Sequence, residues 1–189
     1  MELKTEEDII HVIIEDKWMM DILKTVKKLD LPDWWICAGF VRSKIWDVLH
    51  GYDGRTPLPD VDVIYYDPLN LKESIEKKWE RKLKNISPNV PWSVKNQARM
   101  HVINNREPYS SSVDGISKFP ETATALGVNL DEKDNLVLAA PWGIRDVIHL
   151  KVRPTLSFSG TIEGMKLYEN RVESKDWSSI WERIKVYHD

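Results

Sequence analysis

The sequence predicts an α/β or α+β fold, in which helices flank a mixed β-sheet and a helical extension follows at the C-terminus. Short apolar runs rich in β-branched and aromatic residues alternate with longer segments whose apolar residues recur at helical spacing. Two later apolar runs flank the polar stretch DEKD at 131–134, a pattern typical of a β-hairpin. Elements that follow each other in this order pack as helices on a sheet.

Local signals give the order of the elements. The first helix stops before Pro32, a glycine at 39 separates the first strand from the next helix, and Gly51 closes that helix. We expect, in chain order, a helix over 5–29, a strand over 34–39, a helix over 40–50, a loop over 51–59, a strand over 61–66, a helix over 70–86, a strand over 92–95 followed by a turn or short helix, hairpin strands within 122–130 and 135–141, a short helix over 142–150, a strand over 150–154 and helices over 160–189. A single domain is expected over 1–189, with its core at 34–154.

Composition limits the class of protein. The 189 residues carry a net charge of −3 and a pI near 6.0, so no global basic field indicates nucleic acid as a partner. Cys37 is the single cysteine, which excludes an internal disulfide and a cysteine-based zinc site. The N-terminus lacks the apolar core of a signal peptide, and no run of about 18 apolar residues occurs. We therefore expect a cytoplasmic protein without a membrane partner.

Two aspartates open the predicted strand over 61–66. Side chains two residues apart in a strand point to the same face, so Asp60 and Asp62 project together, with Cα atoms roughly 6.5 Å apart. Two carboxylates this close repel each other unless a cation neutralises them, and Mg²⁺ with phosphate oxygens suits such a pair. In the alternative interpretation Asp60 ends the preceding loop and Asp62 is solvated where the strand begins.

A glycine precedes the predicted helix over 40–50, in the sequence ICAGFVRS. Backbone N–H groups at such a helix start favour phosphate, and Arg42 in the first turn adds a charge-assisted contact. Gly39 alternatively serves only the turn between strand and helix. The strand–glycine–helix unit is followed by a loop and then by the strand with Asp-x-Asp. Together these two motifs form a more specific pattern than either motif alone.

The segment KNQARMH concentrates polar side chains that suit a nucleotide: Lys95, Asn96, Gln97 and Arg99. Amide and guanidinium groups read a base or hold a phosphate. The alternative is a polar turn with solvated charges.

Five sequence blocks carry a resemblance to a known family: CAGFVRSKIWD, PLPDVDVIYYD, WSVKNQARMH, FPETATALGV and PWGIRDV. They resemble a bacterial nucleotidyltransferase-like family of the DNA polymerase beta superfamily, related in fold to the head domain of CCA-adding enzymes. The resemblance implies a polymerase-beta-like fold in which Gly39 and Phe40 approach a triphosphate. It further implies that Asp60 and Asp62 bind Mg²⁺, as two ions with an NTP, and that a nucleoside monophosphate is transferred to a hydroxyl acceptor that the sequence does not identify.

The chain departs from the superfamily pattern in three places. Phe40 stands where a small residue is usual, and the loop between Gly39 and Asp60 is long. Ser93 stands where a third carboxylate is expected, although Glu121 or Asp114 is a candidate to replace it. The runner-up function is accordingly a nucleotide- or metal-binding module with impaired catalysis. An RNA-interacting protein that shares only the head-domain fold is a third alternative, disfavoured by the net charge.

Overall fold

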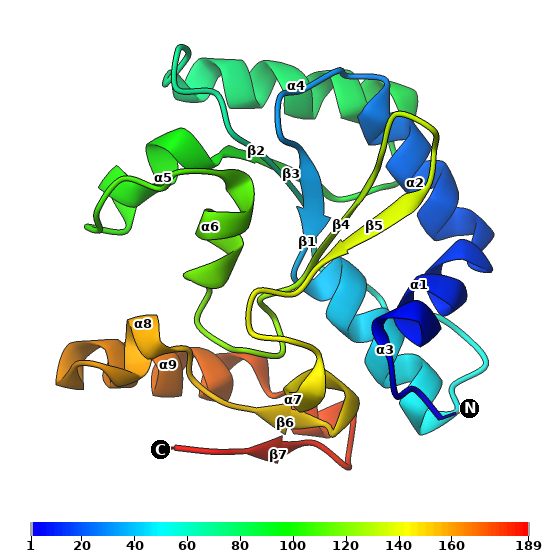
Figure 1. Cartoon of the computed structure of the whole chain (residues 1–189), viewed down its shortest axis with the longest axis vertical. Helices are drawn as coiled ribbons and strands as arrows, with labels where there is room; N and C mark the ends of the chain where they lie inside the picture. The colour runs from blue at the N-terminus through cyan, green and yellow to red at the C-terminus, as the bar shows by residue number, and fades with distance from the viewer. Residues whose placement is uncertain (1, 189) are drawn as a thin grey trace.

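The computed structural model describes residues 2–188 and has a five-stranded mixed sheet at its centre (Figure 1). Its elements are α1 (Glu6–Ile14), α2 (Lys17–Lys27), β1 (Trp35–Cys37), α3 (Gly39–His50), β2 (Val61–Tyr65), α4 (Glu73–Ile86), β3 (Trp92–Asn96), α5 (Gln97–Ile103), α6 (Ser112–Ser117), β4 (Gly127–Leu130), β5 (Leu136–Ala139), α7 (Arg145–Ile148), β6 (Lys151–Val152), α8 (Leu156–Ser159), α9 (Ile162–Lys175), a 3₁₀ turn (Trp177–Ser179) and β7 (Lys185–Val186). The predicted mixed sheet with flanking helices is confirmed.

The strands of the sheet lie in the order β3-β2-β1-β4-β5. Strands β2 and β3 are parallel, with α4 as their crossover, and the other neighbours are antiparallel. The predicted hairpin is β4–β5. Strand β3 is an edge, and carboxylates of α4 accept hydrogen bonds from its backbone: Glu80 from Val94 at 3.4 Å and Glu76 from Asn96 at 3.0 Å. These carboxylates cover an edge that is otherwise open to pairing with another strand.

The two faces of the sheet differ. Ile36 pairs with Val63 and Val128, and Val63 pairs with Val94, so these side chains share one face. All four are fully buried in the main core, together with residues of α1, α2, α3 and α4. The opposite face carries Asp62 and is covered only in part, by α5, α6 and the segment 119–125 (Figure 1). The pocket that contains Asp62 therefore lies on the second face.

Three expectations about the elements need correction. The single helix predicted over 5–29 is wrong: two helices meet at Asp16, whose carboxylate caps α2 at Met19 N and pairs with Lys44 and Arg55. A side chain that bonds its own backbone in this way favours a helix start over a helix interior. The helices predicted over 160–189 are wrong at Lys185–Val186, which form strand β7, and helix α6 was not predicted. The strand predicted over 150–154 shortens to β6, which lies outside the main sheet and pairs with β7.

The C-terminal extension consists of α8, α9, the 3₁₀ turn and β7, and β7 joins it to β6. Helix α9 is held by Tyr168, a fully buried residue whose hydroxyl donates to the carbonyl of Val152 at 3.1 Å and contacts that of Tyr187 at 2.8 Å. Trp177 and Trp181 pack edge-on against Trp46 of α3. The extension is thereby fixed to the helix that follows β1. No helix within residues 2–188 has the length and apolarity needed to cross a membrane.

Candidate functional site

The acid pair stands at the start of β2, on the partly open face of the sheet. Asp62 pairs in register with Cys37 of β1 and Ser93 of β3, so all three side chains project on the same face. Val61 and Val63 point into the core on the other face. Asp47 of α3 accepts hydrogen bonds from the backbone and hydroxyl of Thr56, which anchors the long loop before Asp60. Asp60 comes directly before the first residue of β2, so the same-face arrangement of the two aspartates stays a prediction.

The charge of Asp62 is not balanced within the protein. Burial, and then repulsion by Asp60, raise its pKa to about 6, against smaller opposing effects of Ser93, Arg171 and Lys175. The Cys37 thiol beside it donates to the Asp62 carbonyl at 3.6 Å, and burial together with both aspartates raises its pKa. A buried carboxylate with a second carboxylate beside it has the donor chemistry of a divalent-cation site.

Gly39 begins α3 beside this pair. A Cβ atom added at Gly39 would meet Arg42 Nη2 at 3.6 Å and Leu58 at 3.8 Å, which are ordinary contacts. The protein itself therefore does not require glycine there. Ala38, the residue before it, has a φ of 58° and a ψ of −121°, a backbone conformation that is rare for a residue with a side chain and of a kind that clusters at functional sites. The side chain of Phe40 packs in the core against Trp18.

Arg42 is buried rather than presented to a ligand. Its guanidinium lies over the rings of Trp46 and Trp177, at 5.0 and 4.5 Å, and donates to the Thr124 hydroxyl at 3.1 Å. Burial lowers its pKa to about 10, and Glu121 is the largest of the neighbours that oppose this. Arg42 thus belongs to the wall behind the acid pair.

The KNQARMH segment divides between the site and the scaffold. Lys95 and Gln97 line a pocket in front of Asp62. The Asn96 amide is occupied by the backbone around it, including Asp67 and Ala98. Arg99 forms a two-armed ion pair with the buried Glu76. The structure therefore brings two of the four predicted residues to the site.

Neither alternative carboxylate joins the pair. Glu121 is fully buried and accepts from Arg171 Nε at 2.6 Å. Asp114 accepts from Ser110 and pairs with Lys118 at 3.4 Å. Within residues 2–188 no group of three or more histidine, cysteine, aspartate or glutamate side chains is arranged to hold a metal ion. The site has two carboxylates, with Ser93 at the position of a third.

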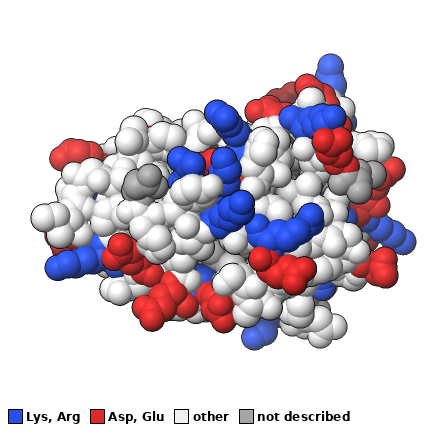
Figure 2. All heavy atoms as spheres, turned by 90° about the horizontal axis from the view of Figure 1, so that it is seen from below, with Lys and Arg blue, Asp and Glu red and all other residues white. Residues whose placement is uncertain are grey.

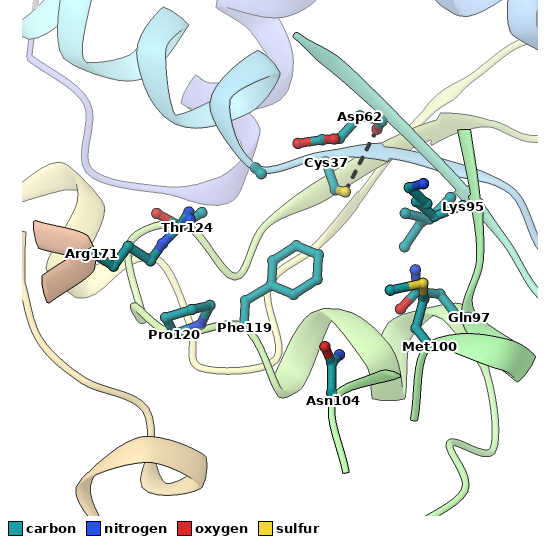
Figure 3. A pocket seen from close by; sticks show the side chains of 12 residues that line it. Cys37, Asp62, Lys95, Gln97, Met100, Asn104, Phe119, Pro120, Thr124 and Arg171 are labelled. Atoms are coloured by element: carbon teal, nitrogen blue, oxygen red, sulfur yellow. Dashed lines mark hydrogen bonds between the residues drawn. The ribbon is translucent and has the colours of Figure 1, made fainter. Parts of the chain in front are cut away.

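The pocket in front of Asp62 has a volume of about 230 Å³. Figure 3 shows Cys37 and Asp62 on its strand side, Lys95 and Gln97 at one end, and Arg171 with Thr124 at the other. Ligand pockets that enclose a whole small molecule measure about 300–1,000 Å³, so this one encloses only part of a nucleotide. Arg171 was missed by the sequence analysis. The sequence pattern that could have identified it is its position three residues after Tyr168, which places both residues on the same side of α9.

Comparison with known proteins agrees with this architecture. The chain matches the family model described as nucleotidyltransferase over residues 24–186. It is 34% identical, with a TM-score of 0.86, to a protein whose NMR structure "reveals a CCA-adding enzyme head domain"; the match covers 98% of this chain and 97% of the other. The comparison with curated proteins found no match.

Larger enzymes share the fold at lower identity. The Thermotoga maritima CCA-adding enzyme in complex with tRNA is 14% identical, with a TM-score of 0.56, over 97% of this chain and 42% of the enzyme. A CCA-adding enzyme in complex with CTP is 16% identical, with a TM-score of 0.52, over 94% of this chain and 41% of the other. This chain thus corresponds to less than half of those enzymes. Because the family model matches most of its length, the chain belongs to the nucleotidyltransferase family.

Proposed function

We propose that the protein transfers a nucleoside monophosphate from a Mg²⁺-bound NTP to a hydroxyl acceptor. The observation that carries the proposal is Asp62 at the pocket wall with Asp60 close enough to repel its charge, so that burial and then this repulsion raise the pKa of Asp62 to about 6. Relatives of the same fold have been solved with CTP and with ATP. The donor set fits Mg²⁺, which takes carboxylate and phosphate oxygens.

Each residue has a separate role in this proposal. Asp60 and Asp62 hold the metal, which when bound supplies the positive charge that polarises the phosphoryl oxygens. The N-terminus of α3 at Gly39 presents backbone donors to phosphate. Lys95, at the pocket wall, adds a cation whose other partner is Glu76 at 3.9 Å. Catalysis then rests on positioning and on charge stabilisation.

Isothermal titration calorimetry with Mg-NTP, followed by transfer of label from an α-labelled NTP, tests the proposal. Asp60→Asn with Asp62→Asn should abolish Mg²⁺-dependent NTP binding while the circular dichroism spectrum stays that of the parent. If the double variant binds Mg-NTP as tightly as the parent, the metal site is not at this pair. NTP binding without transfer would favour the impaired module that we named as the runner-up.

We further propose that the acceptor hydroxyl belongs to a polyanion. Lys151 and Lys185 lie directly opposite each other in the β6–β7 ribbon, and neither forms an ion pair with any of residues 2–188, whereas Arg153 pairs with Asp146 at 3.8 Å. Arg153 and Lys151 lie over the Tyr187 ring, at 4.2 and 5.9 Å. Figure 2 shows Lys and Arg side chains gathered on the face that carries this ribbon. Cations interleaved with an aromatic ring suit a single-stranded nucleic acid, despite the net charge of −3.

A further inference from the structure

Two arginines lie close to the acid pair, but only one of them faces the pocket. Arg42 is 7% exposed, and two tryptophan rings cover its guanidinium. The side chain of Arg171 is 34% exposed and lines the pocket together with Asp62. In Figure 3 it extends from α9 to the side of Thr124. The arginine available to a ligand therefore comes from the C-terminal extension and not from α3.

The guanidinium of Arg171 is held at one end and free at the other. Its Nε donates to Glu121 Oε1 at 2.6 Å. Its two terminal amino groups make no hydrogen bond with any side chain or backbone group of residues 2–188. A guanidinium held in this way presents a planar pair of donors whose geometry matches the oxygens of a phosphate.

Glu121 is the group that holds it. Its side chain is fully buried, and Oε2 has no hydrogen-bond partner among the described residues. A buried carboxylate requires a nearby cation, and Glu121 has two, Arg171 and Arg42. Of these two cations Arg171 is the one that is exposed, and it lies at the pocket wall together with Asp62.

The position of Arg171 is built into α9. Tyr168, one turn earlier, fixes the helix to the β6–β7 ribbon through its buried hydroxyl. Gly164, one turn before that, allows α8 to approach closely, because a Cβ atom there would lie 2.3 Å from the Phe158 carbonyl oxygen. Lys175 follows Arg171 by one turn, at an exposed position near the end of α9. Residues four apart in a helix are neighbours, so the two cations share one face of α9.

We infer that Arg171 and Lys175 of α9 form a polyphosphate subsite opposite the acid pair, and that Glu121 is the positioning residue that orients Arg171 in it. The ligand is the β,γ-phosphate portion of a nucleoside triphosphate, so this inference rests on the proposed function and adds to it. The C-terminal extension is then part of the nucleotide site. Glu121, which the sequence offered as a third metal ligand, acts on phosphate through an arginine instead.

Calorimetry with two probes, Mg-tripolyphosphate and Mg-ATP, tests the subsite on the full-length protein. Removing one charge-assisted hydrogen bond to phosphate weakens binding about 10- to 100-fold, so Arg171→Gln should weaken both probes by that factor. Lys175→Gln should weaken them less, because Lys175 is more exposed. The matched control is Lys166→Gln, which removes one charge from an exposed position of the same helix and should leave both affinities unchanged.

A double-mutant cycle tests the role of Glu121. Glu121→Gln should weaken both probes while Arg171 is present, and should have no further effect in the Arg171→Gln background. Additive effects would show that Glu121 acts independently of Arg171. Should Glu121→Gln fail to fold, Arg171→Lys replaces it: this variant keeps the charge, lacks the Nε anchor, and should bind both probes less tightly than the parent.

The outcomes separate the two proposals. If the parent binds both probes and Arg171→Gln binds them equally well, the subsite is wrong and the proposed function stands. If the parent binds neither probe in the presence of Mg²⁺, the proposed function fails and the subsite fails with it.

Discussion

Ser93 lies directly opposite Asp62 in the parallel ladder between β2 and β3. The hydroxyl is near enough to the carboxylate to lower the pKa of Asp62, against the larger effects of burial and of Asp60. A serine hydroxyl is a weak Mg²⁺ ligand, whereas a carboxylate at the same position would complete a three-acid site. Ser93 therefore lies beside Asp62, as its alignment with a third acid requires.

We predict that this protein binds Mg-NTP with ordinary affinity but turns it over slowly, and that Ser93→Asp raises turnover. Asp60 and Asp62 together with phosphate oxygens would suffice to hold a Mg²⁺ ion that carries the nucleotide, whereas activation of an attacking hydroxyl would depend more on a third carboxylate, which Ser93 does not supply. We expect the turnover of Ser93→Asp to rise about tenfold, which corresponds to about 1.4 kcal/mol of transition-state stabilisation. Single-turnover transfer of label to an acceptor, with Ser93→Asn as the uncharged control, measures it. Equal rates for the two variants would contradict the prediction.

A second prediction concerns stability without metal. The pKa of Asp62 is raised from 3.8 to about 6, so the folded state binds a proton more tightly than the unfolded state. Ionisation of Asp62 therefore destabilises the fold as the pH rises from about 4 through 6. Asp62→Asn should raise the free energy of unfolding at pH 7 by up to about 3 kcal/mol, an advantage that vanishes below pH 4. Urea unfolding with EDTA at both pH values measures it.

The control for this experiment is Asp114, whose pKa is shifted in the opposite direction. Hydrogen bonds from Ser110 and the charge of Lys118 lower the pKa of Asp114, against burial, which is the largest single effect and raises it. Asp114→Asn should therefore destabilise the protein at pH 7, and the difference should shrink as the pH falls through the folded-state pKa. An Asp62→Asn variant that is less stable than the parent at pH 7 would show that other contacts of Asp62 outweigh its desolvation.

The sequence predicted the sheet better than the site. Strands β1, β2 and β3 are short runs with strong β propensity bounded by turn residues, and local pattern suffices for these. The break at Asp16 was missed because the apolar stripe continues through it on both sides. The β6–β7 ribbon joins segments more than thirty residues apart, and no local sequence pattern predicts such a pairing.

Site residues divide along the same line. Asp60, Asp62 and Gly39 lie in one continuous strand-helix-strand unit, so their spacing alone places them together. Arg171 reaches the pocket only because α9 packs back across the ribbon, which depends on tertiary contacts such as those of Tyr168. Arg42 was expected at the ligand because it follows Gly39. Burial under Trp46 and Trp177 could not be predicted from the sequence of α3.

Gly39 offers a third prediction that separates ligand effects from folding effects. A methyl group at this position fits within ordinary contact distances, so Gly39→Ala should leave the melting temperature within about 2 °C of the parent. Mg-NTP affinity should nevertheless fall, and fall further in Gly39→Val, because the side chain occupies the space that phosphate approaches. Gly54→Ala, in the open loop before β2, is the matched control. Unchanged affinity in both Gly39 variants would mean that the glycine serves only the turn.

The last prediction tests the polyanionic acceptor at the β6–β7 ribbon. Lys151→Gln with Lys185→Gln should weaken binding of a single-stranded RNA, and should lower the slope of log K against log salt by about 0.7 for each phosphate that the lysines no longer neutralise. Mg-NTP affinity should not change, because neither lysine lines the pocket. The control, Lys24→Gln with Lys28→Gln, removes the same charge from exposed positions at the end of α2. Fluorescence anisotropy over a range of salt concentrations distinguishes the two pairs. Equal weakening by both would mean that net charge alone governs binding, and the ribbon would then have no specific part in holding the acceptor.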